Sequence, residues 1–384
     1  MWCQRSGARE HNLGMQDFGK LKKWIKDESS LLGACRARIS GPRPPEEDIS
    51  RYDQWIQGGN AAEMLHLSNN AAVRRDTRNL WPKTKSVVCI AVPFDCDSRA
   101  ERDRKKAACD LKGYIACYAR SLDYHGVLHD LLKALGEKIV FRTSGKAEYR
   151  VCVDTAPILE RSLAESSGLG QIGRNKCLIV PGIGSRVVLG ELLLNLEIEP
   201  DEPLAGDPCG ECTLCINACP TGALTAQQEL SPPRCLSYVT IEHRGVIQKK
   251  LSTALENRFF GCDTCLSVCP HNQPPLSPSI ATLNSLSAKH VGRKQTSANP
   301  GAWLDLRCAS EWSSGEIKRR FKQTALSRIS ASMFRRNLCE ILGNIPSAQA
   351  RKLLTMFLDS SSEPVRKSAE RAFQKFIMLD RGNV

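Results

Sequence analysis

The chain has 384 residues, of which 41% are hydrophobic and 25% are charged, and its formal net charge is +13. These proportions are typical of a folded protein of two or three domains and exclude a peptide toxin, a long disordered chain and a fibrous rod. No apolar stretch approaches the roughly 18 residues that a membrane-spanning helix needs, so we expect no membrane association. Residues 1–14 carry neither an apolar core nor a twin-arginine pair, so we expect a cytoplasmic protein.

Residues 15–200 show the mixed helical and strand patterns of an α/β domain. An amphipathic pattern predicts a helix over 15–32, and a second helix is expected at about 52–67, after a proline-rich loop. The short β-branched run 86–94 predicts a buried strand. The remaining patterns predict a helix over 107–139, strands at 149–153 and 177–180, and either a strand or a buried helix over 186–196.

The second half of the chain changes character twice. Residues 201–275 are dense in Cys, Pro and Gly, as expected for a small domain held together by metal. A linker is placed at 276–314, and a helical domain at 315–384 resembles one and a half HEAT-type repeats. So few repeats cannot stand alone, so the whole chain is predicted to be an α+β protein with its helical domain packed on the rest. Its three helices are expected at 332–342, 348–358 and 364–379.

The spacing of the cysteines is the strongest signal in the sequence. The chain has 18 cysteines and no export signal, which favours metal ligands over disulfides. From residue 209 the pattern C-x-x-C-x-x-C-x-x-x-C-P is that of bacterial ferredoxins, in which three thiolates hold one [4Fe-4S] cluster and the fourth crosses to a second. The second run lacks one ligand, and Cys235 is the available replacement. In this arrangement the last cysteine of each run binds the cluster of the other run. One cluster is therefore assigned Cys209, Cys212, Cys215 and Cys269, and the other Cys219, Cys235, Cys262 and Cys265.

Other interpretations of these motifs were weighed. Structural zinc also binds C-x-x-C pairs, but three thiolates at successive spacings of three crowd one tetrahedral ion and suit a cluster. The remaining ten cysteines are expected to be small buried hydrophobic residues. The glycines of 168–173 spell a dinucleotide fingerprint only by coincidence, because they follow a helix and not a strand. Asp123 and His125 begin a cobalamin D-x-H-x-x-G box, but Leu128 replaces its glycine, so His125 is expected to be an ordinary helix residue.

With these motifs in place, the chain resembles the epoxyqueuosine reductase family. The matching segments are GYIACYARSLDYHGVL (113–128), VDTAPILERSLAESSGLGQIGRN (153–175), the three cysteine segments and ENRFFGCDTC (256–265). The resemblance covers about 50–275 and matches the helical tail more loosely. It implies an enzyme that uses cobalamin and two [4Fe-4S] clusters to complete queuosine at the wobble position of tRNA. Reductive dehalogenases are similar in chemistry, but they usually carry an export signal.

The resemblance also implies roles for single residues. The family's proton donor falls on Asp154, and the family's tRNA-contacting basic position falls on Arg244. An acid at the end of a strand could lie in an apolar pocket and stay protonated near neutral pH, whereas the alternative for Asp154 is an N-cap of the helix 159–166. The sequence departs from the family at Gln171, Lys176 and His271. The implied cobalamin contacts are Arg74, Ala116, Asp154, Gly173, Ser237, Asp263 and Thr264.

The distribution of charge bears on the partner. Residues 316–384 contain 14 Lys and Arg against 6 Asp and Glu, an excess of +8. This basic tail favours contact with tRNA phosphates, with solubility as the alternative explanation. We therefore expect a monomeric epoxyqueuosine reductase that takes electrons from an external low-potential donor. The alternatives are a small-molecule corrinoid reductase and a non-catalytic two-cluster electron carrier.

Overall fold

The main sheet of the protein lies in its N-terminal half. The computed structural model describes residues 15–96, 98–227, 230–273, 276–290 and 301–382. The sheet order is β1-β2-β7-β4, and every pairing in it is antiparallel. The mixed helix and strand content expected for this half is present, but the topology is α+β, since its main sheet has no parallel pair. The four strands are β1 (Arg36–Ser40), β2 (Ser86–Pro93), β7 (Val187–Leu194) and β4 (Tyr149–Cys152).

Helices cover both faces of this sheet, which is why β2 is buried along its whole length. On one face α1 (Met15–Leu32) and α7 (Tyr124–Arg142) enclose an apolar core. A Cβ added to Gly136 would come within 2.6 Å of the Tyr149 ring, so this glycine allows α7 to approach β4 closely. On the other face α8 (Glu160–Ser166) packs on β2 and β7. Nearby lie α2 (Glu46–Gln57), α3 (Leu65–Asn69), α4 (Ala71–Arg75), η1 (Thr77–Asn79), β5 (Gln171–Ile172) and β6 (Leu178–Ile179).

A second sheet joins distant parts of the chain. Its order is β8-β3-β9, with β3 parallel to β8 and antiparallel to β9. The predicted helix over 107–139 is wrong in its first third, because the chain forms a strand there between two helical segments. Buried pairing with strands far along the sequence overrides the local helical pattern. The elements are α5 (Ser98–Arg102), α6 (Arg104–Cys109), β3 (Lys112–Ile115), η2 (Cys117–Ala119), β8 (Arg258–Phe260) and β9 (Trp303–Asp305).

The region expected to be a linker is largely folded. It contributes α13 (Leu283–His290), which packs near α7, and it contributes β9 to the second sheet. Part of the expected linker, 291–300, lies outside the described residues. The cysteine-rich part before it consists of short elements: α9 (Leu214–Ala218), η3 (Pro232–Arg234), α10 (Leu236–Ile241), α11 (Lys249–Leu255), α12 (Thr264–Ser267) and η4 (Pro270–Asn272).

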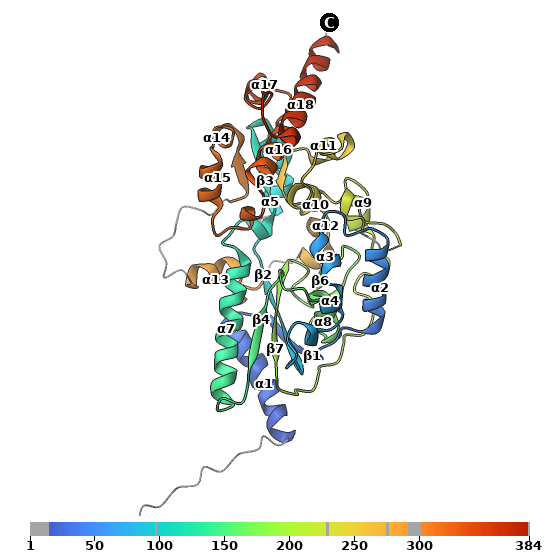
Figure 1. Cartoon of the computed structure of the whole chain (residues 1–384), viewed down its shortest axis with the longest axis vertical. Helices are drawn as coiled ribbons and strands as arrows, with labels where there is room; N and C mark the ends of the chain where they lie inside the picture. Colours follow the sequence, from blue (N-terminus) through green and yellow to red (C-terminus); the bar gives the residue numbers. More distant parts are fainter. Residues whose placement is uncertain (1–14, 97, 228–229, 274–275, 291–300, 383–384) are drawn as a thin grey trace, which may run out of the picture.

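The C-terminal helices pack on the second sheet, as expected (Figure 1). The rings of Phe259 and Phe334 meet edge to face with centroids 4.8 Å apart. The fully buried Arg336 donates to the carbonyl oxygens of Val239 at 3.0 Å and Gly245 at 3.1 Å, which fastens the helices to the cysteine-rich part. Within the described residues, no helix has the length and apolar character to cross a membrane. The helices are α14 (Leu306–Ser310), α15 (Ser314–Phe321), η5 (Ala325–Arg328), α16 (Ala331–Leu342), α17 (Ala348–Thr355) and α18 (Glu363–Gly382).

Candidate active site and cluster-binding sites

The four cysteines assigned to the first cluster surround one cavity. Its volume is about 240 Å³, and its lining includes Cys209, Cys212, Cys215 and Cys269. Cys209 and Cys212 lie in the turn region just before α9, Cys215 lies within α9, and the fourth sulfur comes from the second cysteine run. A backbone N–H, that of Arg174, donates to the Cys209 sulfur at 3.4 Å, as suits a thiolate ligand. The arrangement can hold a cluster with donors from both runs.

His271 closes the edge of the same cavity. This residue is one of the positions at which the sequence departs from the family. Its Nε2 lies 2.9 Å from the carbonyl oxygen of Pro208, and both residues line the cavity. His271 therefore lies at the edge of the cavity lined by the first four cysteines, and not in the pocket around Asp154.

The four cysteines assigned to the second cluster also come together. Burial raises the pKa of Cys262, and Cys235 adds to that rise, which shows that the two thiols are neighbours. Burial and the nearby Cys262 and Cys235 likewise raise the pKa of Cys265 well above its ordinary value. Cys219 acts in the same way on Cys235 and accepts a backbone N–H from Ala223 at 3.2 Å. Four thiols from three segments thus form a second group of candidate ligands.

Not all of the other cysteines are the buried single thiols that the sequence suggested. Cys96 and Cys117 form a disulfide, and Cys109 and Cys308 are exposed. Cys177 was also missed, since it lies close to both cluster groups and its pKa is raised to about 11 by burial and by the neighbouring cysteines. Only their three-dimensional neighbours distinguish these residues from ordinary apolar positions.

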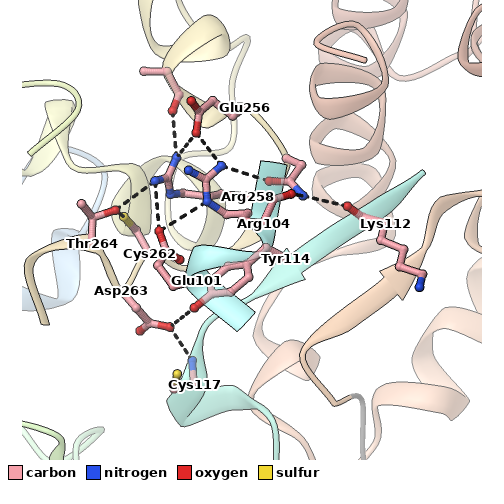
Figure 2. A network of polar contacts seen from close by, with 12 residues as sticks. Glu101, Arg104, Lys112, Tyr114, Cys117, Glu256, Arg258, Cys262, Asp263 and Thr264 are labelled. Atoms are coloured by element: carbon pink, nitrogen blue, oxygen red, sulfur yellow. Dashed lines mark hydrogen bonds and ion pairs between the residues drawn. The ribbon is translucent and has the colours of Figure 1, made fainter. Parts of the chain in front are cut away.

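A buried polar network supports the loop that carries Cys262 and Cys265 (Figure 2). The Asp263 carboxylate, 2% exposed as a residue, accepts the Tyr114 hydroxyl at 2.8 Å and the Cys117 backbone N–H at 2.7 Å. Behind it, Arg258 donates to the Thr264 hydroxyl at 3.0 Å. Arg258 and its neighbour Arg104 share the acidic partners Glu101 and Glu256. The network fixes the two predicted contacts Asp263 and Thr264 between cluster ligands.

Asp154 lies between β4 and α8, where the backbone turns sharply and its φ is +40°. One carboxylate oxygen, Oδ2, accepts three donors from two distant segments. The Tyr124 hydroxyl donates at 2.9 Å, His125 Nε2 lies at 3.0 Å, and Arg328 Nη1 donates at 2.9 Å. Tyr124 and His125 open α7, whereas Arg328 ends η5 in the C-terminal part. The site therefore combines residues from the N-terminal half of the chain with one from its C-terminal part.

The surroundings of Asp154 correct two expectations. Burial alone would raise its pKa, but the hydrogen bond from His125, the charge of Arg328 and the Tyr124 hydroxyl hold it below the ordinary value. The pocket is polar and cationic, so Asp154 is a carboxylate at neutral pH and not a protonated acid. It is not a helix cap either, since Leu159 occupies the N-cap of α8 without a side-chain bond.

His125 is more than an ordinary helix residue. Its Nδ1 lies 2.6 Å from Asp123 Oδ1, while its Nε2 faces Asp154. Its ring stacks on Tyr124 with centroids 4.3 Å apart. Burial lowers its pKa, but the bonds and charges of the two aspartates prevail and raise it to about 9. The sequence signal for this arrangement was the D-x-H spacing, which was interpreted only as a failed cobalamin box.

A group of buried ionisable residues lies behind Asp154. Arg74, 7% exposed, donates Nη1 to the Ile158 carbonyl at 3.0 Å, but its Nε has no partner among the described residues. Burial and the charge of Asp154 raise the pKa of Glu160 to about 7. Glu191 is fully buried in β7, neither of its oxygens has a partner in the described part of the chain, and burial raises its pKa well above the ordinary value. The only sequence signal for Glu191 is a lone acid in an apolar strand.

The other predicted pocket residues lie around this centre. Ala116 is buried just before η2, Ser237 is partly exposed on α10, and Gly173 follows β5. A Cβ added to Gly173 would come within 2.6 Å of the Ile179 side chain, so a larger residue there would require that side chain to move. Tyr118 lies near both aspartates. Its ring centroid is 6.1 Å from that of Tyr124, which donates to Asp154, and it directly follows Cys117, whose backbone N–H donates to Asp263. Burial and the charges of Asp154 and Asp263 raise its pKa.

The remaining departures lie beside the pocket and not in it. The Gln171 side chain donates to the carbonyl oxygen of Gly206, which ties β5 to the start of the cysteine-rich part. Lys176 adopts a positive φ of 64° in the turn before β6, and its N–H bonds the Gly173 carbonyl.

The predicted tRNA-contacting position is on the surface. Arg244 is exposed, and its backbone N–H donates to Glu63 at 2.8 Å. Glu242, two residues earlier, lies 3.6 Å from Arg328, which connects this turn to the Asp154 site. The basic tail is divided in function, because Arg336 is fully buried while Lys318 and Lys322 are exposed.

Two family models match the chain. One, described as "4Fe-4S double cluster binding domain", matches residues 208–272. The other, described as "Epoxyqueuosine reductase QueG, DUF1730", matches residues 74–155. The first match spans all eight candidate cluster cysteines, and it favours clusters over zinc. The second ends one residue after Asp154.

Curated relatives match over most of the length. The chain is 34% identical over 334 residues to the epoxyqueuosine reductase of Vibrio cholerae, which covers 86% of this chain and 85% of the relative. It is 32% identical over 372 residues to that of Pseudomonas aeruginosa, with 95% of this chain and 97% of the relative covered. A crystal structure of epoxyqueuosine reductase with an epoxyqueuosine-modified tRNA-Tyr stem loop superposes with a TM-score of 0.77 and 25% identity over 94% of this chain and 91% of that chain.

Proposed function

The chain belongs to the epoxyqueuosine reductase family, and from this premise we propose how its residues reduce the epoxide of epoxyqueuosine in tRNA to queuosine. The observation that carries the proposal is that Tyr118 lies near both Asp154 and Asp263, the latter between Cys262 and Cys265. Its ring centroid is 6.1 Å from that of Tyr124, which donates to Asp154, and it directly follows Cys117, whose backbone N–H donates to Asp263. Proton donation and electron delivery thus meet at one place. In this proposal 15–200 holds cobalamin, 201–275 the clusters, and 315–384 contacts tRNA.

Electrons reach this place through the cysteine-rich part. In the proposal Cys209, Cys212, Cys215 and Cys269 bind one [4Fe-4S] cluster, and Cys219, Cys235, Cys262 and Cys265 bind the other. The cavity between the first four, and the mutual pKa effects among the second four, support this division. An external low-potential donor supplies the electrons to a monomeric enzyme.

The residues around Asp154 fit cobalamin. Arg74, whose pKa is influenced by Asp154, has a buried Nε with no partner among the described residues, and cobalamin carries amide and phosphate oxygens that could accept it. Ala116 and Gly173 keep the surroundings small, while Ser237, Asp263 and Thr264 add polar groups. When bound, the clusters deliver electrons singly and cobalamin supplies the reductant directed at carbon. The chain itself orients the substrate and controls the proton.

Asp154 is the proposed donor of the proton that the departing oxygen takes up. It is partly exposed, at 31% of its side chain, so substrate can reach it. Since the free carboxylate has a lowered pKa, it must first receive a proton from a neighbour. General acid catalysis of this kind contributes about 10²–10⁴ in rate.

The C-terminal part and the turn at Arg244 are the proposed tRNA contacts. Arg244, Lys318 and Lys322 are exposed and basic, as phosphate binding requires. Arg328 contacts both Asp154 and Glu242, two residues before Arg244. In the proposal a base turned out of the anticodon loop therefore enters beside Arg328. The small-molecule reductase and the electron carrier are not favoured, because the relatives named epoxyqueuosine reductase match over most of both chains.

The proposal is tested with an epoxyqueuosine-containing anticodon stem loop. The protein is reconstituted anaerobically with iron, sulfide and cobalamin, and a chemical low-potential reductant is added. We expect mass spectrometry of the nucleosides to show queuosine, with iron, sulfide, cobalamin and the reductant all required. Conversion that proceeds without cobalamin would contradict the cofactor assignment, and no conversion by the fully reconstituted protein would contradict the function.

A further inference from the structure

The reaction needs more protons than Asp154 can carry. Converting an epoxide to an alkene consumes two electrons and two protons and releases one water molecule. The first proton neutralises the oxygen as its first C–O bond breaks, and the second lets that oxygen leave as water when its other C–O bond breaks. A carboxyl group holds one proton, and Asp154 is a carboxylate in the free protein. A second group must therefore supply protons to Asp154.

His125 is placed to be that group. Its two ring nitrogens face two carboxylate oxygens, Asp123 Oδ1 at 2.6 Å and Asp154 Oδ2 at 3.0 Å. A neutral imidazole carries a proton on only one nitrogen, so it would set a lone pair against one of these oxygens. The ring satisfies both only as imidazolium. Its side chain is 22% exposed, so solvent can restore the proton after each transfer.

We propose that His125 passes protons to Asp154, which delivers them to the substrate oxygen, and that Asp123 holds the ring for this transfer. This inference rests on the proposed function. In each transfer the Nε2–H bond breaks, an Oδ2–H bond forms on Asp154, and that proton then moves to the substrate oxygen. His125 regains a proton from solvent, and the two electrons come from the external donor through the clusters. His125 is thus a positioning residue that acts through Asp154.

Other charged groups face this pair and must be considered in any pH experiment. Arg328 and the Tyr124 hydroxyl share Asp154 Oδ2 with His125. Glu160 titrates at about 7 and is influenced by both Asp154 and His125. The remaining groups nearby are Arg74, Arg161, Tyr118, Glu242 and the fully buried Glu191, whose pKa Asp154 and Glu160 raise in addition to burial. Because Glu160 could produce its own step near neutral pH, the variant Glu160→Gln is included as a control.

The first measurement is the titration of His125 itself. The full-length protein, labelled with ¹³C-histidine, is titrated by NMR, and the signal of His125 among the seven histidines is identified by its loss in His125→Gln. We expect its pKa near 9, well above the ordinary value of about 6.5, and a fall of about one unit or more in Asp123→Asn. A pKa at or below the ordinary value would overturn the proposal. This result does not depend on turnover.

The second measurement is the pH profile of single-turnover reduction. In the wild type the proton is present below the raised pKa of His125, so the rate should fall as pH rises through about 9. Gln at 125 can still donate to Asp154 but has no proton to give, so His125→Gln should lose about 10²-fold or more at pH 8 and recover as pH falls. Glu160→Gln should keep the alkaline fall.

The outcomes separate this inference from the function on which it rests. If the wild type reduces the stem loop while His125→Gln keeps both its rate and its alkaline fall, His125 only orients Asp154 and the inference is wrong. If the wild type itself fails, the proposed function is wrong, whatever the NMR titration shows. Iron content and stem-loop affinity of each variant should match the wild type, which excludes misfolding as the cause.

Discussion

Two aspartates of this protein, Asp154 and Asp263, have similar hydrogen bonds and opposite surroundings. Each accepts a tyrosine hydroxyl, from Tyr124 at 2.9 Å in one case and from Tyr114 at 2.8 Å in the other. The other donors to Asp154 are the cationic His125 and Arg328, whereas the other donor to Asp263 among the described residues is a neutral backbone N–H. The pKa of Asp154 is consequently lowered, while burial raises that of Asp263.

The comparison separates an open site from a closed one. At Asp154 the side chains of His125, Asp154 and Arg328 are about a fifth to a third exposed, so solvent and substrate can change their partners and protonation. In the ion network behind Asp263 the two arginines are buried, with side chains 4% and 8% exposed for Arg258 and Arg104, and the Glu256 side chain, at 44%, is the most exposed of the four charged members. Charges in the open site are available for chemistry, and charges in the closed site hold the cluster loop in place.

The largest expected effect is on turnover in Asp154→Asn. The amide is nearly isosteric but cannot deliver a proton, so single-turnover reduction should fall by about 10²-fold or more. Iron content and the optical spectrum of the reduced protein should stay as in the wild type. The matched variant is Asp263→Asn, whose side-chain oxygen still accepts from Tyr114 and Cys117. The rate of single-turnover reduction by Asp263→Asn should fall about tenfold or less, since one or two hydrogen bonds are weakened. Equal losses would remove the distinction between the two aspartates.

The next effect concerns stability and concentrates on the closed site. Arg258→Met leaves Glu101 and Glu256 with one cationic partner fewer. Removing one member of a fully buried ion pair costs about 3–5 kcal/mol, and the loss here should be smaller, because the Glu256 side chain is 44% exposed and Arg104 still pairs with both acids. We expect a lower denaturation midpoint and poor cluster loading. The control is Arg307→Met, because the pair of Arg307 with Asp305 is exposed and contributes about 0–1 kcal/mol. If the two variants have the same denaturation midpoint, the network does not support the loop.

A smaller effect is expected for Arg328→Gln, and it depends on pH. Because Asp154 has a lowered pKa in the folded protein, its charge stabilises the fold above the ordinary value of about 3.9, and this contribution is lost as pH falls through the lowered value. Without the Arg328 charge the lowering is smaller. The variant should therefore melt a few degrees below the wild type at pH 7, by about 2–4 °C for each kcal/mol lost, with a gap that closes below about pH 4. A gap that is constant with pH would point to lost packing alone.

The cysteine pattern predicted the cluster part well, and the reason is local. Cluster ligands come at fixed spacings because neighbouring thiolates must reach one small group, so the family match to 208–272 confirms a pattern visible in the sequence. A short β-branched run also predicted β2 correctly, and a helical pattern predicted α1 correctly. By contrast, β3 was predicted as helix, since only its pairing with β8 and β9 makes it a strand.

The protonation state of Asp154 could not be predicted, because its partners are distant in the sequence. His125 precedes it by 29 residues and Arg328 follows it by 174. An acid at a strand end is equally consistent with an apolar pocket, a helix cap and a cationic site. The charge count of the tail also cannot distinguish buried from exposed residues. It includes both the buried Arg336 and the exposed Lys318, although only an exposed side chain can contact phosphate.

The smallest expected effect tests that division of the tail. Lys318 and Lys322 are exposed and one helical turn apart, so Lys318→Gln with Lys322→Gln removes two candidate phosphate contacts without touching the core. Each lost contact should reduce the slope of log affinity against log salt by about 0.7–0.9, so stem-loop affinity should fall severalfold at low salt and little at high salt. The control, Lys83→Gln with Lys133→Gln, removes the same charge from two lysines whose side chains are 57% and 56% exposed in the N-terminal half. If both doubles weaken binding equally, only net charge matters and the tail has no specific contact. If only the tail double changes the slope, its exposed lysines bind phosphate while the buried Arg336 serves the fold.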